Sequence, residues 1–98
     1  MVKHMIIWKT KDDVADKPTA LKEVKTALEG LVGQIDGLLE MHILTDCYPC
    51  SAGDVMMDSL FTDIEALNAY QAHPKPQEIA SGMVSPLMAQ RLSFDYEV

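Results

Sequence analysis

Residues 2–9 form a short apolar run that ends at charged residues, a pattern that suits a β-strand better than a helix. On a strand, His4, Ile6 and Trp8 point to one side, and the two apolar residues between them point to the other. Apolar side chains therefore occupy both faces in the middle of this strand. A fold that accommodates it has to cover both faces.

Two longer segments repeat apolar side chains every three or four residues, as amphipathic helices do. The first predicted helix spans about residues 18–33, with Asp16 as its N-cap and Pro18 in its first turn. The second follows a Thr-Asp-Ile-Glu capping box at residues 62–65, in which the threonine hydroxyl is the expected cap. It ends near His73, because the prolines that follow cannot continue it.

Three further strands and a third helical stretch complete the predicted pattern. The strands are expected at residues 38–47, 55–61 and 91–98, and a broken helical stretch is expected at residues 77–89. In the second strand, Leu39, Met41 and Ile43 are expected to share one face. Turn-forming residues at 46–54 predict a loop between adjacent strands. The last strand alternates apolar and polar residues, so we expect one of its faces to be wet.

The resulting order, βαββαβ, is that of ferredoxin-like α+β folds, in which helices cover one face of a four-stranded antiparallel sheet. The predicted strands at residues 2–9 and 55–61 nevertheless carry apolar residues on both faces. An uncovered apolar sheet face is an association surface, and a two-fold homodimer is the commonest way to cover it. We therefore predict one domain over residues 1–98 that pairs with a second copy of itself.

The charge of the chain argues against two classes of partner. Eight Lys and Arg residues against 15 Asp and Glu residues give a formal net charge of −7, which repels phosphate backbones and anionic lipids. We expect neither nucleic acid nor membrane as a partner. The apolar run at the N-terminus is too short for a signal peptide or a membrane span, so the expected location is the cytoplasm.

The two cysteines, Cys47 and Cys50, form a C-x-x-C pattern that can hold a metal or cycle as a dithiol. Zinc requires four ligands, and the sequence has no second such pattern. Redox pairs normally open a helix that lowers the thiol pKa, whereas this pair lies in a predicted loop. We therefore predict neither a metal nor a cofactor.

Several short motifs follow one another in an order and spacing typical of one family. They are Val-Lys-His ending at His4, Leu31-Val32 with Ile35, Phe61 before the capped helix, Tyr70 three residues before His73-Pro74, and Phe94-Asp95-Tyr96. Over nearly its whole length the chain resembles the stress-responsive dimeric α+β barrel family, Dabb. This family includes heat-stable plant stress proteins and plant polyketide cyclases such as olivetolic acid cyclase. The resemblance implies a ferredoxin-like fold, a homodimer whose sheets form a barrel, and in some members a pocket between sheet and helices.

The resemblance also assigns roles to single positions. In the cyclase, a tyrosine on the second helix and a histidine beyond the His-Pro act on a polyketide. Tyr70 matches the tyrosine, but Pro76 occupies the histidine position and cannot accept a proton. The histidine that opens the first strand matches His4. Some plant members bind magnesium through backbone carbonyls, at positions that match Val32, Ile35 and Leu38.

The candidate catalytic residues are thus His4 and Tyr70, with Ile6, Trp8 and His73 as expected lining of the same pocket. Such a pair can polarise a carbonyl or move a proton near neutral pH. In the alternative interpretation, His4 is a buried, hydrogen-bonded histidine, Tyr70 is a core aromatic residue, and His73 caps the C-terminal end of the second helix.

Two functions remain open from the sequence. The first is a non-catalytic stress-type homodimer whose pocket binds a small apolar molecule or nothing. The second is a small cofactor-independent enzyme, such as a cyclase, lyase or monooxygenase, that uses His4 and Tyr70.

Overall fold

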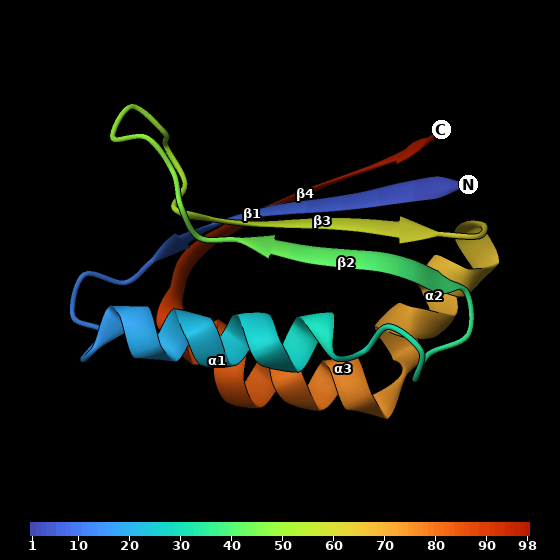
Figure 1. The fold of residues 1–98 in the computed structure, drawn as a ribbon, viewed down its shortest axis with the longest axis horizontal. Coiled ribbons are helices and arrows are strands. Elements are labelled where there is room, and N and C mark those ends of the chain that lie inside the picture. The colour runs from blue at the N-terminus through green and yellow to red at the C-terminus, as the bar shows by residue number, and fades with distance from the viewer.

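A four-stranded antiparallel sheet forms one layer of the structure, and the helices form the other (Figure 1). The computed structural model describes residues 1–98. The elements are β1 (Val2–Thr10), α1 (Lys17–Glu29), β2 (Leu38–Leu44), β3 (Val55–Phe61), α2 (Ile64–Ala72), α3 (Pro74–Ile79), the π-helical turn η1 (Ala80–Val84), the 3-10 turn η2 (Ser85–Leu87) and β4 (Met88–Glu97). The strand order is β2-β3-β1-β4. The predicted ferredoxin-like α+β fold, with helices on one face, is confirmed. None of the helices has the length and apolar composition needed to cross a membrane.

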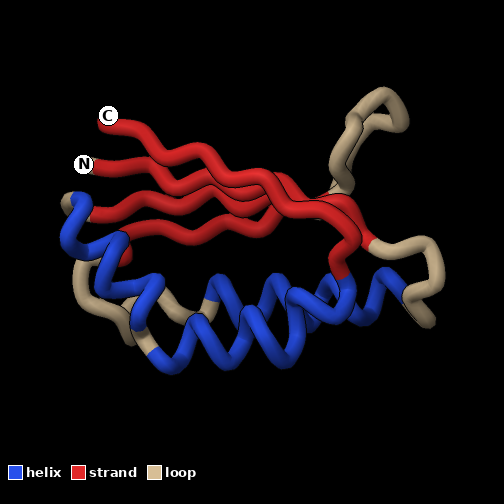
Figure 2. Tube along the Cα trace, turned by 180° about the vertical axis from the view of Figure 1, so that it is seen from behind, coloured by secondary structure: helices blue, strands red, loops and turns tan.

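Strand β1 lies inside the sheet, between β3 and β4. Its residues His4, Ile6 and Trp8 are buried beneath the helices, whereas Ile7 points to the opposite face and is half exposed. Figure 2 shows all the helices on one side of the sheet and none on the other. The sheet face without helices, called the open face below, is thus the second apolar face that the sequence predicts for β1.

Helix α1 is shorter than predicted, because it ends at Glu29 and not near residue 33. Leu31 and Ile35 are still buried, but they lie in successive turns that follow the helix. Turns and helices place apolar residues at similar spacings, so the periodicity did not separate them. The predicted N-cap position is confirmed, but the side chain does not cap the helix. Asp16 occupies the N-cap position in a left-handed conformation, with φ 46°, and its side chain makes no capping hydrogen bond.

The cap of α2 is Asp63 and not the threonine of the predicted capping box. The Asp63 carboxylate accepts a hydrogen bond of 2.8 Å from the Ala66 N–H. Thr62 precedes the cap because its own N–H donates to the Gly37 carbonyl at 2.9 Å, a contact that ties it to the turn before β2. The helix therefore starts one residue later than the sequence pattern indicated.

A bulge near the start of β2 changes which residues share a face. The pairing of β2 with β3 shifts register between Leu38 and Glu40. As a result Leu38, Met41 and Ile43 are buried, while Leu39 is exposed. The prediction that Leu39 shares a face with Met41 and Ile43 is therefore wrong, since strict alternation cannot anticipate the extra residue of a bulge.

Strand β4 is an edge strand, and none of its residues is buried within the chain. Its apolar residues pair with residues of β1 that point away from the helices, with Leu92 opposite Ile7 and Phe94 opposite Met5. Leu92 and Phe94 are consequently 75% and 70% exposed. The expectation that only one face of this strand is wet is wrong for the single chain. One side of β4 has no helix over it, and on the other side the helices do not extend far enough to bury the strand.

The other edge of the sheet, β2, is protected by two charged residues of α1. The Ile43 N–H donates to the Glu29 carboxylate at 2.8 Å, and the Lys25 ammonium donates to the Ile43 carbonyl at 2.9 Å. Lys25 and Glu29 also pair with each other at 2.8 Å. Because exposed edge groups invite pairing with other chains, this contact both fastens α1 to the sheet and closes the edge.

Replacing Glu29 with Ala is expected to lower the free energy of unfolding by about 1 kcal/mol, because the edge N–H of Ile43 loses its acceptor. Burial alone would raise the pKa of Glu29, but the hydrogen bonds from Ile43 and Lys25 hold it below its ordinary value of 4.5. The stabilisation is therefore present above about pH 4.5 and disappears as the pH falls through the lowered pKa.

Urea denaturation of the wild type and of Glu29→Ala, at pH 7 and at pH 3, measures their difference in free energy of unfolding. The difference is expected at pH 7 and is expected to be smaller at pH 3. Glu23→Ala, on the exposed side of α1, is the matched control and is expected to unfold like the wild type. Equal stability of Glu29→Ala and Glu23→Ala at pH 7 would contradict the assigned role of the edge contact.

Candidate functional site

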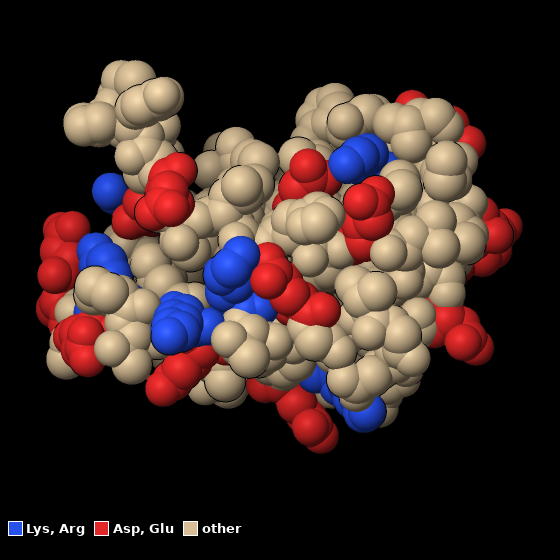
Figure 3. All heavy atoms as spheres, in the orientation of Figure 1, with Lys and Arg blue, Asp and Glu red and all other residues tan.

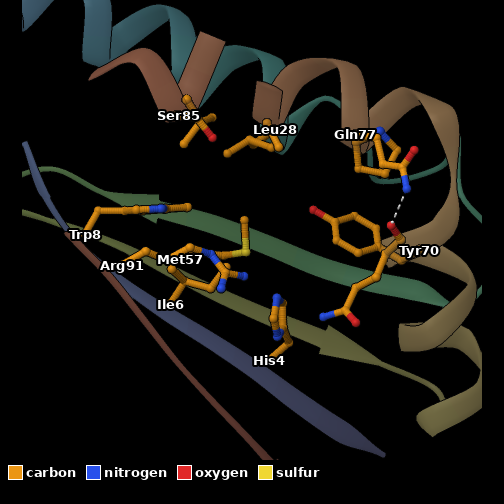
Figure 4. A pocket seen from close by; sticks show the side chains of 13 residues that line it. His4, Ile6, Trp8, Leu28, Met57, Tyr70, Gln77, Ser85 and Arg91 are labelled. Carbon is orange, nitrogen blue, oxygen red and sulfur yellow. Dashed lines mark hydrogen bonds between the residues drawn. The ribbon is translucent and has the colours of Figure 1, made fainter. Parts of the chain in front are cut away.

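A cavity of about 430 Å³ lies between the sheet and the helices. Its floor is formed by side chains of the sheet, namely His4, Ile6 and Trp8 of β1, Met57 of β3 and Arg91 of β4. Its roof is formed by residues of the helical layer, which include Leu28, Tyr70, Pro76, Gln77 and Val84. Figure 4 shows these two groups of side chains facing each other across the space. The cavity is the part of the molecule in which sheet and helices do not fill the volume between them.

His4 lies on the floor of this cavity and is only 2% exposed. The pairing of β1 with β4 places it directly opposite Asp95, and its Nδ1 forms a short hydrogen bond with the Asp95 carboxylate. The other ring nitrogen, Nε2, has no hydrogen-bond partner within the chain. With Nδ1 donating its proton to the carboxylate, Nε2 carries the lone pair. Asp95 thus orients the imidazole and leaves Nε2 able to accept a proton.

Tyr70 enters the cavity from α2, and its hydroxyl points into the space above the sheet (Figure 4). Its ring packs edge-on against Phe61, with ring centres 5.1 Å apart, and against His4, with ring centres 6.4 Å apart. Burial raises the pKa of Tyr70 to about 12, although the positive charge of Arg91 acts to lower it. The hydroxyl therefore stays neutral near neutral pH and serves as a hydrogen-bond donor.

Four of the five predicted site residues line this one cavity: His4, Tyr70, Ile6 and Trp8. The fifth, His73, is absent from the lining. It ends α2, and its Nδ1 accepts the Lys75 N–H at 3.1 Å, which makes it the N-cap of α3. The expectation that His73 lines the cavity is therefore wrong, whereas its expected position as the C-cap of α2 is confirmed. Its ring acts on the next helix, as the acceptor at the start of α3.

Asp95 and Arg91 are the functional candidates that sequence reasoning missed. Both lie on β4, on the polar side of the alternation that predicted this strand. The polar side was expected to be solvated. Pairing of the first and last strands instead brings it next to the helix-facing residues of β1, so that Asp95 meets His4 and Arg91 lies opposite Trp8.

The C-x-x-C pattern lies away from the cavity. Cys47 and Cys50 are free and exposed in the loop between β2 and β3, which rises from the open face of the sheet (Figure 1). The tip of this loop carries no charged side chain (Figure 3). No group of three or more His, Cys, Asp or Glu side chains is arranged to hold a metal ion.

Comparison with solved structures places the chain among ferredoxin-like proteins described as dimeric. A Bacteroides fragilis protein described as dimeric and of unknown function superposes with a TM-score of 0.87 and 24% identity, over 99% of this chain and 95% of that chain. An Arabidopsis thaliana protein superposes with a TM-score of 0.83 and 25% identity, over 100% of this chain and 95% of that chain. A hydroxynitrile lyase from Passiflora edulis superposes with a TM-score of 0.83 and 15% identity, over 99% of this chain and 92% of that chain. The likenesses below 25% identity establish the fold alone.

Sequence comparison gives the family. No curated protein matches the chain. The sequence profile of the stress responsive A/B barrel domain matches residues 2–98, which is nearly the full length. The resemblance read from the short motifs is therefore confirmed, and the chain belongs to the stress responsive A/B barrel domain family, Dabb.

Proposed function

We propose that this protein is a homodimer that binds a small aromatic or polyketide-like carbonyl compound and transfers a proton on it without a cofactor. His4 is the general base, Asp95 is the positioning residue that orients it, and Tyr70 is the hydrogen-bond donor. The observation that carries the proposal is the pairing of His4 with Asp95, which leaves Nε2 free inside a cavity that also receives the Tyr70 hydroxyl.

The proposed chemistry follows from the charges that these groups carry. Nε2 of His4 takes a proton from the carbon next to the carbonyl group. The electron pair of the broken C–H bond forms a C=C bond, and the π pair of the carbonyl group moves onto its oxygen. Tyr70, neutral because burial raises its pKa, donates a hydrogen bond to the oxygen as it becomes negative. The imidazolium that forms is stabilised by the Asp95 carboxylate. The ring centres of His4 and Tyr70 lie 6.4 Å apart, so both groups can contact one small ligand.

Hydrogen–deuterium exchange at the α-carbon of phenylacetone, followed by NMR in D₂O, tests this function. The wild type is expected to accelerate the exchange. His4→Gln, which fills similar space without a base, is expected to lower the catalysed rate at least about 100-fold. Asp95→Asn is expected to lower it less, because the imidazole remains present but is no longer held by a carboxylate.

His42→Gln is the matched control, since His42 lies on the open face of β2 and outside the cavity. It is expected to exchange the substrate proton at the wild-type rate. Binding is followed separately through the indole N–H of Trp8, which lines the cavity and is the only tryptophan in the chain. An exchange rate that is the same for His4→Gln and the wild type would overturn the role of His4 as the base.

A second function, a binding protein without catalysis, is supported by Pro76. This residue lines the cavity at the position where the resemblance to plant cyclases places a catalytic histidine. A pocket with fewer proton-transfer groups can still hold an apolar ligand against Ile6 and Trp8. A shift of the Trp8 resonance by phenylacetone without accelerated exchange would favour this function over the first.

The proposed homodimer uses the open face of the sheet. Ile7, Leu92 and Phe94 expose apolar side chains there, and the helices of the chain lie on the other face. Similar solved structures, including the Bacteroides fragilis protein, are described as dimeric. Pairing of two open faces would bury these residues and complete the barrel that the family name describes.

Ile7→Glu is expected to weaken dimer formation about 100-fold or more, because the change places an unpaired charge in the centre of the proposed interface. Analytical ultracentrifugation of the variant and the wild type measures it. Ile64→Glu is the matched control, because Ile64 is exposed to the same extent as Ile7, 48% against 47%, but lies at the start of α2 in the helical layer. A dimer of Ile7→Glu as tight as that of Ile64→Glu would rule out the open face as the interface.

The raised pKa of Tyr70 predicts a pH dependence of stability. The folded protein holds this proton more tightly than the unfolded chain, whose tyrosine has the ordinary value of 10.0. The stability linked to the proton is therefore present below about pH 10 and is lost as the pH rises toward 12. The loss is on the order of 2 kcal/mol.

Urea denaturation at pH 9 and pH 11.5 checks this expectation. Tyr70→Phe has no proton to lose, so its stability is expected to fall less than that of the wild type over this interval. Tyr48→Phe, in the exposed loop, is expected to retain the wild-type pH dependence. Parallel curves for Tyr70→Phe and the wild type would show that Tyr70 is not responsible.

A further inference from the structure

The cavity differs in charge from the rest of the molecule. The chain carries a formal net charge of −7, yet no Asp or Glu lines the cavity. Arg91 is the only Lys or Arg in the lining. The nearest carboxylate assigned to the site, that of Asp95, is already engaged by Nδ1 of His4. An anionic group that enters the cavity therefore meets a positive charge and no lining carboxylate.

Arg91 reaches this position from β4. It lies opposite Trp8 in the strand pairing, on the side of β4 that faces the helices. Figure 4 shows its side chain extending over the floor of the cavity. Its positive charge acts on the Tyr70 hydroxyl, whose pKa it lowers against the larger effect of burial. The guanidinium thus lies within electrostatic range of the proposed catalytic groups.

The guanidinium has no partner inside the chain. All six ion pairs of the structure involve other residues, and no side-chain hydrogen bond ends on Arg91. A planar guanidinium that is free of internal carboxylates can bind a ligand carboxylate through two parallel hydrogen bonds. The walls beside it, Ile6, Trp8 and Met57, offer an apolar surface of the kind that holds an aromatic ring or an alkyl chain.

We propose that the cavity selects a carboxylate ligand with an apolar aromatic body, in which the carboxylate binds the Arg91 guanidinium and the body lies against Trp8 and Ile6. This inference rests on the proposed small-molecule site and specifies its ligand class. Arg91 is then the specificity-determining residue of the cavity, and it acts on binding and not on the proton transfer itself.

Two probes of the same shape test the proposal, 4-butylbenzoate and its uncharged counterpart 4-butylbenzamide. Binding is followed by NMR at the Trp8 indole N–H. The wild type is expected to bind the benzoate at least about tenfold more tightly than the benzamide, the ratio that a charge-assisted hydrogen bond supplies. Arg91→Gln is expected to abolish this preference while leaving benzamide binding unchanged. Arg91→Lys keeps the positive charge but cannot make two parallel hydrogen bonds to a carboxylate, so it is expected to retain part of the preference.

Lys11→Gln is the matched control, because it changes the net charge equally at an exposed residue outside the cavity. It is expected to retain the full preference for the benzoate. Benzamide binding also shows whether each variant keeps the folded cavity.

The outcomes separate this inference from the proposed function. Equal binding of the two probes by the wild type, or a preference that survives in Arg91→Gln, would overturn the role of Arg91 and leave the small-molecule site intact. Binding of neither probe at millimolar concentration would overturn the small-molecule site together with the inference.

Discussion

The pairing of β1 with β4 fixes both the candidate site and the open face. Its register sets His4 opposite Asp95 and Trp8 opposite Arg91, so that two charged residues of an edge strand reach the helix-covered side. The same register sets Ile7 opposite Leu92 on the other side. A slip of one residue would exchange the two sets, placing Leu92 toward the helices and Asp95 on the open face. The acid–base pair and the apolar face are therefore two consequences of a single strand register.

This dependence links the site to the proposed assembly. Within the chain, β4 is held by β1 along one edge, and none of its residues is buried. The residues beside Asp95 along the strand, Phe94 and Tyr96, point to the open face, where their rings lie 5.9 Å apart. In the proposed dimer, a second copy would cover these rings and restrict the movement of the strand that carries Asp95 and Arg91. The precision with which His4 is oriented would then depend on dimer formation.

The sequence predicted elements well and contacts between distant elements poorly. Local periodicity located the four strands and the two longer helices, because alternation and helical spacing are properties of neighbouring residues. The third helical stretch, expected at residues 77–89, instead begins at Pro74 and ends at Leu87, where β4 follows at Met88. It failed where one residue changes the geometry, as in the bulge that exposes Leu39 and the cap at Asp63. It also failed for Asp95, which is 91 positions from its partner His4. Strand pairing at that separation depends on register, and no local pattern in the two strands specifies it.

The proposed chemistry is limited by the number of bases in the cavity. Pro76 lines the roof at the position where the resemblance to plant cyclases places a histidine, and the lining contains no carboxylate. His4 is then the one side chain of the lining with a ring nitrogen free to act as a base, while Tyr70 remains a neutral donor because burial raises its pKa. A reaction that requires two bases at separate atoms does not fit this arrangement. A reaction in which His4 removes one proton and returns it to the same substrate fits it, since the proton removed by the imidazole remains available on Nε2 for the second step.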